Sequence, residues 1–176
     1  YITFSSTGNA TDFGDLTQSR EYPSGCSNGT YGLFGGGGNG SDDGFYNVID
    51  YITIASTANA QDFGDLTVAR NKLASVNDAT YGVWAGGTVN DTSSSNVMDY
   101  VAMASTGNCS DFGDLTAAAE APTGVCDATR GVFAGGIGPD YSSYSNIIEY
   151  ITISTPGNGT DFGDLTTTKV SMGTTG

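Results

Sequence analysis

The sequence predicts an all-β protein built from repeated units of four short antiparallel strands. The string Asp-Phe-Gly-Asp-Leu starts at four places: Asp12, Asp62, Asp111 and Asp161. A second string, Asn-Val-Ile-Asp-Tyr in its first copy, returns at three places: 47–54, 96–103 and 146–153. No stretch keeps apolar residues at helical spacing, and the repeated strings are rich in β-branched and aromatic residues. A unit of about 50 residues with four strands indicates a blade of a β-propeller.

The four strands of one repeat can be assigned in chain order. A weak strand is expected at 25–27, and Asn28-Gly29 after it is a typical tight-hairpin sequence. The next strand, 30–34, ends at a glycine pair, which stops a strand without steric cost. A third strand is expected within 45–54, and the fourth contains Asp-Phe-Gly-Asp-Leu. We expect the phenylalanines of this string to be buried between neighbouring repeats: Phe13, Phe63, Phe112 and Phe162.

The repeats divide a single repeat domain, residues 1–176, into about three and a half blades. The expected divisions are a partial blade at 1–21, full blades at 22–71, 72–120 and 121–168, and the start of a further blade at 169–176. Propellers close with about four to eight blades, so this number cannot close a ring alone. We therefore expect a piece of a longer protein, a ring shared between several chains, or blades stacked in an open array.

The order of these motifs resembles the kelch repeat. A glycine pair closes one strand, a strand with a tyrosine follows, and a segment with Asp-Phe and a leucine comes next. The phenylalanines named above stand where kelch blades usually carry tryptophan. The segment 47–67 is also similar to kelch-like repeats in structural and tail-fibre proteins of marine phages, particularly those that infect cyanobacteria. The resemblance implies a β-propeller fold and a structural or attachment role.

Composition excludes several classes of function. Five basic and nineteen acidic residues give a net charge of −14, which opposes binding to nucleic acid and to anionic membranes. Histidine is absent, and with it the commonest general base and transition-metal ligand. No apolar run is long enough for a helix that inserts into a membrane. We expect no catalysis and no cofactor, and a virion or extracellular location. The alternatives are a self-assembling extracellular filament and, less favoured, a fragment of a kelch-type sugar-oxidising enzyme.

The candidate binding residues lie in the loops between the glycine pair and the third strand of each repeat. These loops, 37–45, 88–95 and 137–145, differ in sequence while the strands hardly change, as is typical of the binding face of repeat proteins. The residues that we expect to contact protein partners or surface glycans are Tyr141, Tyr144, Asp140, Asp42, Asp43 and Asp91. Exposed aromatic rings stack on sugars and on protein partners, although the two tyrosines could instead cover the blade below them.

Each repeat also carries an Asn-x-x-Asp-x-x-Asp pattern. Its carboxylates are weak candidates for calcium ligands: Asp12, Asp15, Asp62, Asp65, Asp111, Asp114, Asp161 and Asp164. Asn and Asp side chains also accept backbone N–H groups in turns, and repetition alone explains the recurrence. We favour turns, so the sequence predicts no metal site.

The basic residues follow the repeat as well. Arg20, Arg70 and Lys169 share one position, where the third copy has Ala119. We expect these cations to pair with a carboxylate of a neighbouring blade rather than with an anionic ligand. The three cysteines occupy different positions of the repeat, so small buried thiols are expected rather than a repeated disulfide.

Overall fold

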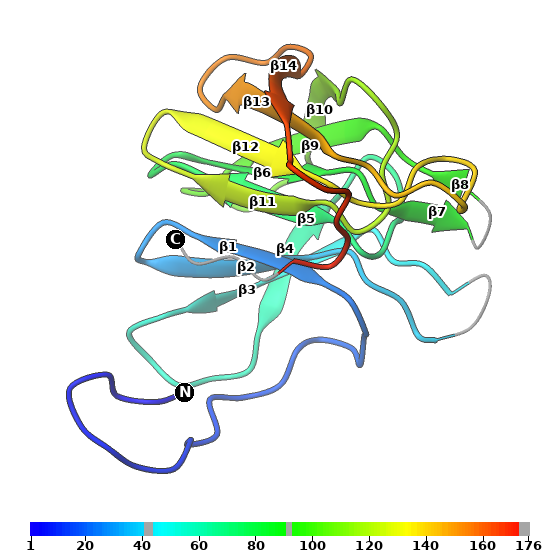
Figure 1. Cartoon of the computed structure of the whole chain (residues 1–176). Coiled ribbons are helices and arrows are strands. Elements are labelled where there is room, and N and C mark those ends of the chain that lie inside the picture. Colours follow the sequence, from blue (N-terminus) through cyan, green and yellow to red (C-terminus); the bar gives the residue numbers. More distant parts are fainter. Residues whose placement is uncertain (41–43, 91–92, 173–176) are drawn as a thin grey trace.

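The computed structural model describes residues 1–40, 44–90 and 93–172, and these residues form fourteen strands and no helix. The strands make three four-stranded sheets and one two-stranded sheet, all antiparallel (Figure 1). The prediction of an all-β protein is therefore confirmed.

The three large sheets are built in the same way along the chain. The first contains β1 (Ser24–Ser27), β2 (Tyr31–Gly35), β3 (Val48–Thr53) and β4 (Gln61–Asp65). The second contains β5 (Ala74–Asn77), β6 (Tyr81–Ala85), β9 (Val97–Ala102) and β10 (Ser110–Asp114). The third contains β11 (Thr123–Cys126), β12 (Arg130–Ala134), β13 (Ile147–Thr152) and β14 (Thr160–Asp164). Between β6 and β9, strands β7 (Thr88–Asn90) and β8 (Ser93–Ser94) form the small sheet.

Each sheet begins with a hairpin whose turn is closed by a side chain. In the first sheet, Oδ1 of Asn28 accepts the N–H groups of Thr30 and Tyr31 at 3.0 and 2.9 Å. Asp78 and Asp127 accept the equivalent N–H groups in the second and third sheets. A short polar side chain at this position therefore fixes the register of the first two strands.

The Asp-Phe-Gly string forms a β-bulge in the outer strand. On β4, Asp62 pairs with Asp50 and Gly64 pairs with Ile49, so Phe63 between them has no partner across the ladder. The same irregularity occurs in the other two large sheets. Gly64 has φ +149°, and a Cβ there would lie 2.2 Å from the carbonyl oxygen of Gly107 in the next repeat. Glycine after the phenylalanine is thus needed for the close approach of consecutive repeats.

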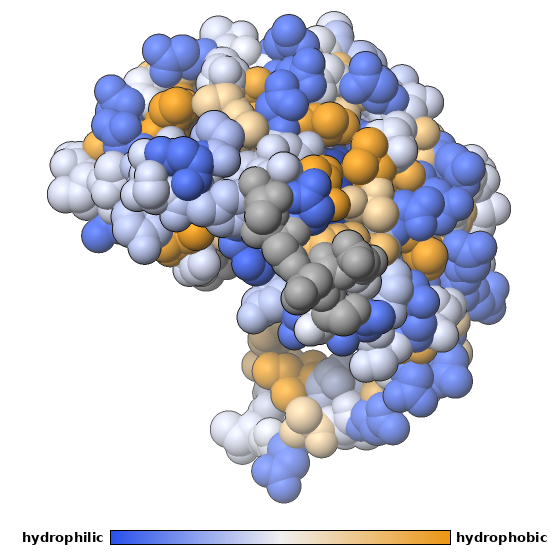
Figure 2. Space-filling model, turned by 90° about the vertical axis from the view of Figure 1, so that its right-hand side faces the viewer, coloured by the Kyte–Doolittle hydropathy of each residue, from blue (hydrophilic) through white to orange (hydrophobic). Residues whose placement is uncertain are grey.

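The first strands of the three sheets lie side by side. Strand β5 contacts β1 on one side and β11 on the other. Ser24 donates its hydroxyl to the hydroxyl of Ser75 at 2.8 Å, and Asn77 donates its amide to the carbonyl oxygen of Ser27 at 2.7 Å. The sheets therefore pack face against face, and Figure 2 shows a curved outline that is hollowed on one side.

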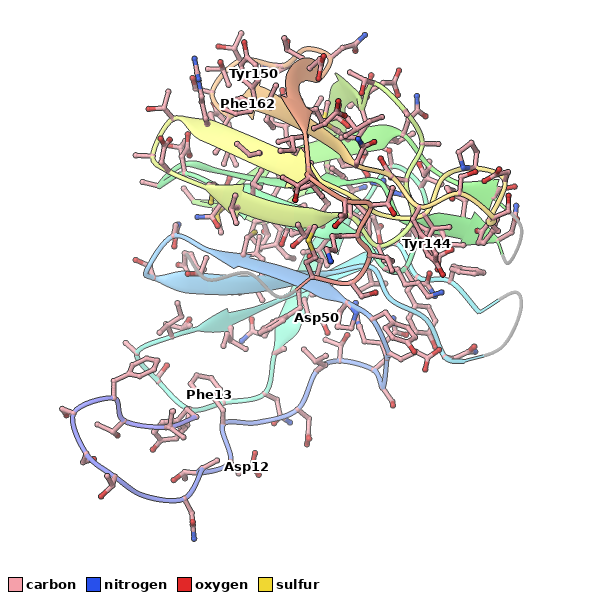
Figure 3. All side chains as sticks on the ribbon, viewed as in Figure 1. Asp12, Phe13, Asp50, Tyr144, Tyr150 and Phe162 are labelled. Carbon is pink, nitrogen blue, oxygen red and sulfur yellow. The ribbon has the colours of Figure 1, made fainter. Side chains whose placement is uncertain are left out.

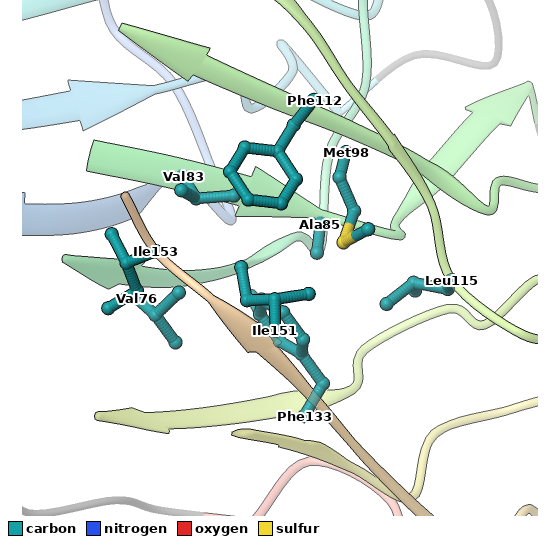
Figure 4. Packing of buried hydrophobic residues seen from close by; sticks show 10 residues of the cluster. Val76, Val83, Ala85, Met98, Phe112, Leu115, Phe133, Ile151 and Ile153 are labelled. Atoms are coloured by element: carbon teal, nitrogen blue, oxygen red, sulfur yellow. The ribbon is translucent and has the colours of Figure 1, made fainter. Parts of the chain in front are cut away.

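The hydrophobic core lies between consecutive sheets. Leu33, Ile49, Phe63, Trp84 and Met103 belong to the cluster between the first and second sheets. The members of the cluster between the second and third sheets include Val83, Met98, Phe112, Leu115, Phe133 and Ile151 (Figure 4). Each sheet therefore depends on its neighbour for the burial of its apolar face. The expected burial of the repeated phenylalanine is confirmed at Phe63 and Phe112.

The two ends of the chain differ from this pattern. Phe162 is 60% exposed and Phe13 is half-buried, and they lie at opposite ends of the molecule (Figure 3). The expectation that every repeated phenylalanine is buried between repeats is wrong for Phe162, because none of the described residues covers its face. Residues 1–20 form no strand, although a strand was expected around Phe13; the backbone there lacks the inner strands with which it would pair.

Candidate functional site

The variable loop of the third sheet carries three of the predicted binding residues. Tyr144 is 57% exposed, whereas Tyr141 is half-buried and donates its hydroxyl to the carbonyl oxygen of Asn90 at 3.4 Å. Tyr144 is therefore the ring that is available to a partner, and Tyr141 joins its loop to the hairpin of the second sheet. The predicted residues Asp42, Asp43 and Asp91 lie outside the described residues.

Asp140 holds the turn of this loop. Its carboxylate accepts the backbone N–H and the hydroxyl of both Ser142 and Ser143, at 2.7 to 3.2 Å. The hydroxyls of Ser143 and Ser142 are the main cause that lowers the pKa of Asp140 well below its usual range. Since its oxygens are occupied within the loop, Asp140 shapes the surface beside Tyr144 rather than offering free acceptors.

The repeated carboxylates and amides act as turn and junction acceptors. Oδ1 of an aspartate accepts the N–H of the glycine two residues later, at 3.0 to 3.2 Å, in three repeats: Asp12, Asp111 and Asp161. The asparagine oxygen accepts an N–H of the preceding repeat, from Asp15, Asp65 and Asp114 to Asn59, Asn108 and Asn158 respectively, at 3.0 to 3.1 Å. Among the residues that the structure describes, no group of three or more His, Cys, Asp or Glu side chains is placed to hold a metal ion.

A buried arginine links the first sheet to the second. Arg70 follows β4, and its Nη2 donates to a carboxylate oxygen of Asp99 on β9. Its Nη1 donates to the carbonyl oxygens of Gly86 and Val97 at 2.6 and 2.7 Å. Thr67 donates its hydroxyl to the other oxygen of Asp99. Both charged side chains are fully buried, so the pair is stable only because each group has its partner.

Arg20 repeats this arrangement one unit earlier. Its Nη2 lies 2.9 Å from Oδ2 of Asp50, and its Nη1 donates to the carbonyl oxygens of Gly36 and Val48 at 3.0 and 2.8 Å. The Thr17 hydroxyl donates to Asp50 at 2.6 Å. The prediction that the basic residue pairs with a carboxylate of the neighbouring repeat is confirmed at both arginines.

The third copy of this arginine position is occupied by Ala119, and a cavity of about 260 Å³ lies beside it. The carboxylate of the copy is present as Glu149, which is 5% exposed and accepts the N–H of Thr116 at 2.7 Å. The cavity is lined by residues of two repeats, among them Ala119, Phe133, Gly135, Tyr144, Ile147 and Glu149. We call this cavity the open arginine slot.

Sequence reasoning missed the open arginine slot, although a signal was present. The repeat alignment shows Ala119 in place of arginine while an acidic residue, Glu149, stands where Asp50 and Asp99 stand. A buried carboxylate without its cation either lowers the stability of the fold or has a second partner. The alignment could not show that the missing side chain leaves a cavity rather than a collapsed contact.

Burial keeps two of the three cysteines protonated. It raises the pKa of Cys26 to about 12, with a smaller contribution from Cys126, and it also raises the pKa of Cys109. The three cysteines are free thiols, as expected, but the expected burial holds only for Cys26, because Cys109 and Cys126 are half-buried. A protonated thiol is a poor nucleophile, so Cys26 and Cys109 offer no reactive group at neutral pH.

No protein-family model and no curated protein sequence matches this chain. In the described residues, no helix is long and apolar enough to cross a membrane.

Proposed function

We propose that this chain is a non-catalytic assembly and binding module whose three large sheets are kelch-like propeller blades. One observation carries the proposal. Phe112 is 2% exposed under the third sheet, whereas its equivalent Phe162 is 60% exposed on the outer face of that sheet. The ring in this repeated position is buried where a complete sheet lies on each side of the junction, at Phe63 and Phe112, so the exposed copy marks a face that another repeat covers.

A further repeat of a longer protein, or the beginning of a second copy of this chain, can occupy that face. At the inner junctions, the backbone N–H of Gly107 donates to the carbonyl oxygen of Phe63, and that of Gly157 to Phe112, both at 2.7 Å. The asparagine next to each glycine accepts an N–H of the same outer strand. Residue Asn9 is the equivalent asparagine in the first copy of the pattern. The segment around Asn9 of one copy is therefore complementary to β14 of another.

Contacts between two different faces generate rings when the rotation closes and filaments when it does not. The propeller resemblance favours a ring, with blades contributed by more than one chain. A filament, the alternative drawn from the sequence, uses the same contact with a different rotation. The resemblance to marine-phage repeats supports a place in a virion or an extracellular assembly.

The binding role rests on the variable loop of the third sheet. Tyr144 presents an exposed ring beside the rigid turn of Asp140, and such rings stack on sugar rings and on protein partners. The chain contains no histidine, and burial keeps Cys26 and Cys109 protonated at neutral pH, which supports a module that binds rather than catalyses.

Light scattering after size exclusion tests the assembly role. The purified chain is expected to associate as its concentration rises, and Phe162→Ser is expected to shift the mass toward the monomer without a change in the β-type circular dichroism spectrum. Val68→Ser is the matched control, because Val68 is an exposed apolar residue, 39% exposed, after β4, and its equivalents Ala117 and Thr167 are exposed as well. A wild-type chain that remains monomeric at high concentration would contradict the proposal.

A further inference from the structure

The open arginine slot keeps the acceptors that a guanidinium group uses in the slot of the second sheet. There, Arg70 donates to the carbonyl oxygens of Gly86 and Val97 and to the carboxylate of Asp99. The equivalent residues of the third sheet are Gly135, Ile147 and Glu149, and all three line the cavity. The third sheet therefore presents two strand-end carbonyls and one carboxylate around a space from which the arginine side chain is missing.

The carboxylate in this slot lacks a cation. Among the described residues Glu149 forms no ion pair, and its Oε2 accepts the N–H of Thr116. Burial raises the pKa of Glu149, the Thr116 hydrogen bond opposes this, and Asp161 adds to the increase. The two equivalent carboxylates each have a buried arginine within hydrogen-bond distance. A cation that enters the slot would give Glu149 the ionic partner that Asp50 and Asp99 already have.

The third sheet is adapted to the larger carboxylate. A Cβ at Gly159 would lie 2.3 Å from Oε2 of Glu149, so glycine at this position leaves room for glutamate. The equivalent residues in the other repeats, Ala60 and Cys109, accompany the shorter aspartate. The loss of arginine at Ala119 is thus matched by a longer carboxylate and a smaller neighbour, which keeps the acceptor in place while the space remains open.

An aromatic ring stands at the mouth of the slot. Tyr144 lines the cavity and is exposed to solvent, on the loop side of the molecule in Figure 3. In the first sheet, the ring of Tyr46 lies over the guanidinium of Arg20, with 5.9 Å between its centroid and the central carbon. Ser145 stands at the position of Tyr46 in the third sheet, so Tyr144, the residue before it, offers the aromatic face to a cation that enters the open slot.

We propose that the open arginine slot binds a guanidinium group supplied from outside the chain, either an arginine side chain of a partner polypeptide or a small guanidine compound. A guanidinium matches the site better than an ammonium, because its planar set of donors can reach the carboxylate and both carbonyls at once. The inference is independent of the proposed assembly face, because Phe162 lies on the outer face of the third sheet and does not line the slot.

Chemical-shift titration of the labelled chain tests the binding. The probes are N-acetyl-arginine amide, N-acetyl-lysine amide and methylguanidine, and the amide signals of Gly135, Ser145 and Ile147 report on the slot. Saturable shifts are expected with the two guanidinium probes, and binding of the lysine probe is expected to be weaker by about tenfold. Tighter binding of the arginine probe than of methylguanidine identifies a polypeptide source, and equal binding identifies a small compound.

Two variants test whether the slot itself is responsible. Ala119→Arg places a guanidinium where Arg20 and Arg70 have theirs, so it is expected to abolish binding of both guanidinium probes and to raise the melting temperature. Glu149→Gln keeps the shape of the site, removes its charge and is expected to weaken binding by about tenfold or more. The matched control is Lys169→Ala, an exposed residue at the next copy of the position. Absence of saturable shifts in the wild-type chain, or equal binding to Ala119→Arg, overturns the proposal. Light scattering distinguishes this proposal from the assembly role, because Ala119→Arg is expected to lose guanidinium binding while it self-associates like the wild type.

Discussion

The second and third sheets have nearly the same motifs, but only the second is covered by a repeat of this chain on both sides. In the second sheet, Arg70 fills its slot and Phe112 is covered by the third sheet. In the third, Ala119 leaves a cavity and Phe162 is exposed. The same string of residues can therefore serve as core in one repeat and as surface in the next. What decides between the two is the neighbouring repeat.

The largest effect is expected for Arg70→Ala, at about 5 kcal/mol, near the upper end of what breaking a buried ion pair costs. The variant leaves the buried carboxylate of Asp99 without its cation and two carbonyl oxygens without their donor. Urea unfolding monitored by tryptophan fluorescence measures the loss, because Trp84 is buried between the first and second sheets. The chain with Lys169→Ala, at the exposed copy of the position, is expected to unfold like the wild type. A loss below about 1 kcal/mol for Arg70→Ala would contradict the importance of the filled slot.

Phe112→Ala is expected to cost about 3–5 kcal/mol, as for other buried phenylalanines. Its ring packs in the cluster with Leu115 between the second and third sheets, and it makes an edge-to-face contact with Tyr100. Phe162→Ala removes the same side chain from the exposed copy and is expected to cost less than about 0.5 kcal/mol in the monomer. The comparison requires denaturation at low protein concentration. Equal losses for the two variants would show that the face of β14 is covered within one chain.

Glu149→Gln is expected to stabilise the chain at neutral pH by roughly 1 kcal/mol, because it removes a buried charge that has a hydrogen bond from Thr116 but no cation among the described residues. Burial raises the pKa of Glu149 above its unfolded value. The folded state therefore binds the proton of Glu149 more tightly than the unfolded state does. Protonated Glu149 stabilises the fold fully below the unfolded pKa, and this stabilisation is lost as pH rises through the folded pKa. The advantage of the variant is therefore expected to disappear below about pH 4.

Urea unfolding at the two pH values checks this prediction, and Asp99→Asn is the matched control. Asp99 has its arginine, so the control is expected to destabilise the chain at neutral pH, with the opposite sign from Glu149→Gln. The same sign for both variants would mean that the filled slot and the open slot do not differ in their electrostatics.

Local patterns predicted the all-β character of the chain, and contacts between repeats account for what the sequence left open. The hairpin at Asn28 depends on residues next to it, so its sequence was sufficient. Whether Tyr141 or Tyr144 is the exposed ring depends on the hairpin of the second sheet, 51 residues away from Tyr141 at Asn90. Likewise the cavity beside Ala119 depends on how closely two repeats approach, which no pattern within one repeat encodes.

The smallest effect is expected for calcium, which should leave the melting temperature unchanged. Oδ1 of Asp111 and of Asp161 already accepts the N–H of the glycine two residues later, and Asn108 and Asn158 accept N–H groups across the junctions. The pattern is the same in the second and third sheets, although their exposure differs, so turn formation explains it in both.

A calcium site would instead raise the melting temperature progressively with calcium concentration. At a hundredfold excess over the dissociation constant, the free energy of unfolding would rise by about 2.7 kcal/mol. Thermal unfolding in calcium chloride, with magnesium chloride as the control of equal charge and with EDTA as the metal-free reference, separates the two. Because exposed carboxylates attract both ions without discrimination, only a rise with calcium that magnesium does not reproduce would show that these aspartates bind a metal as well as closing turns.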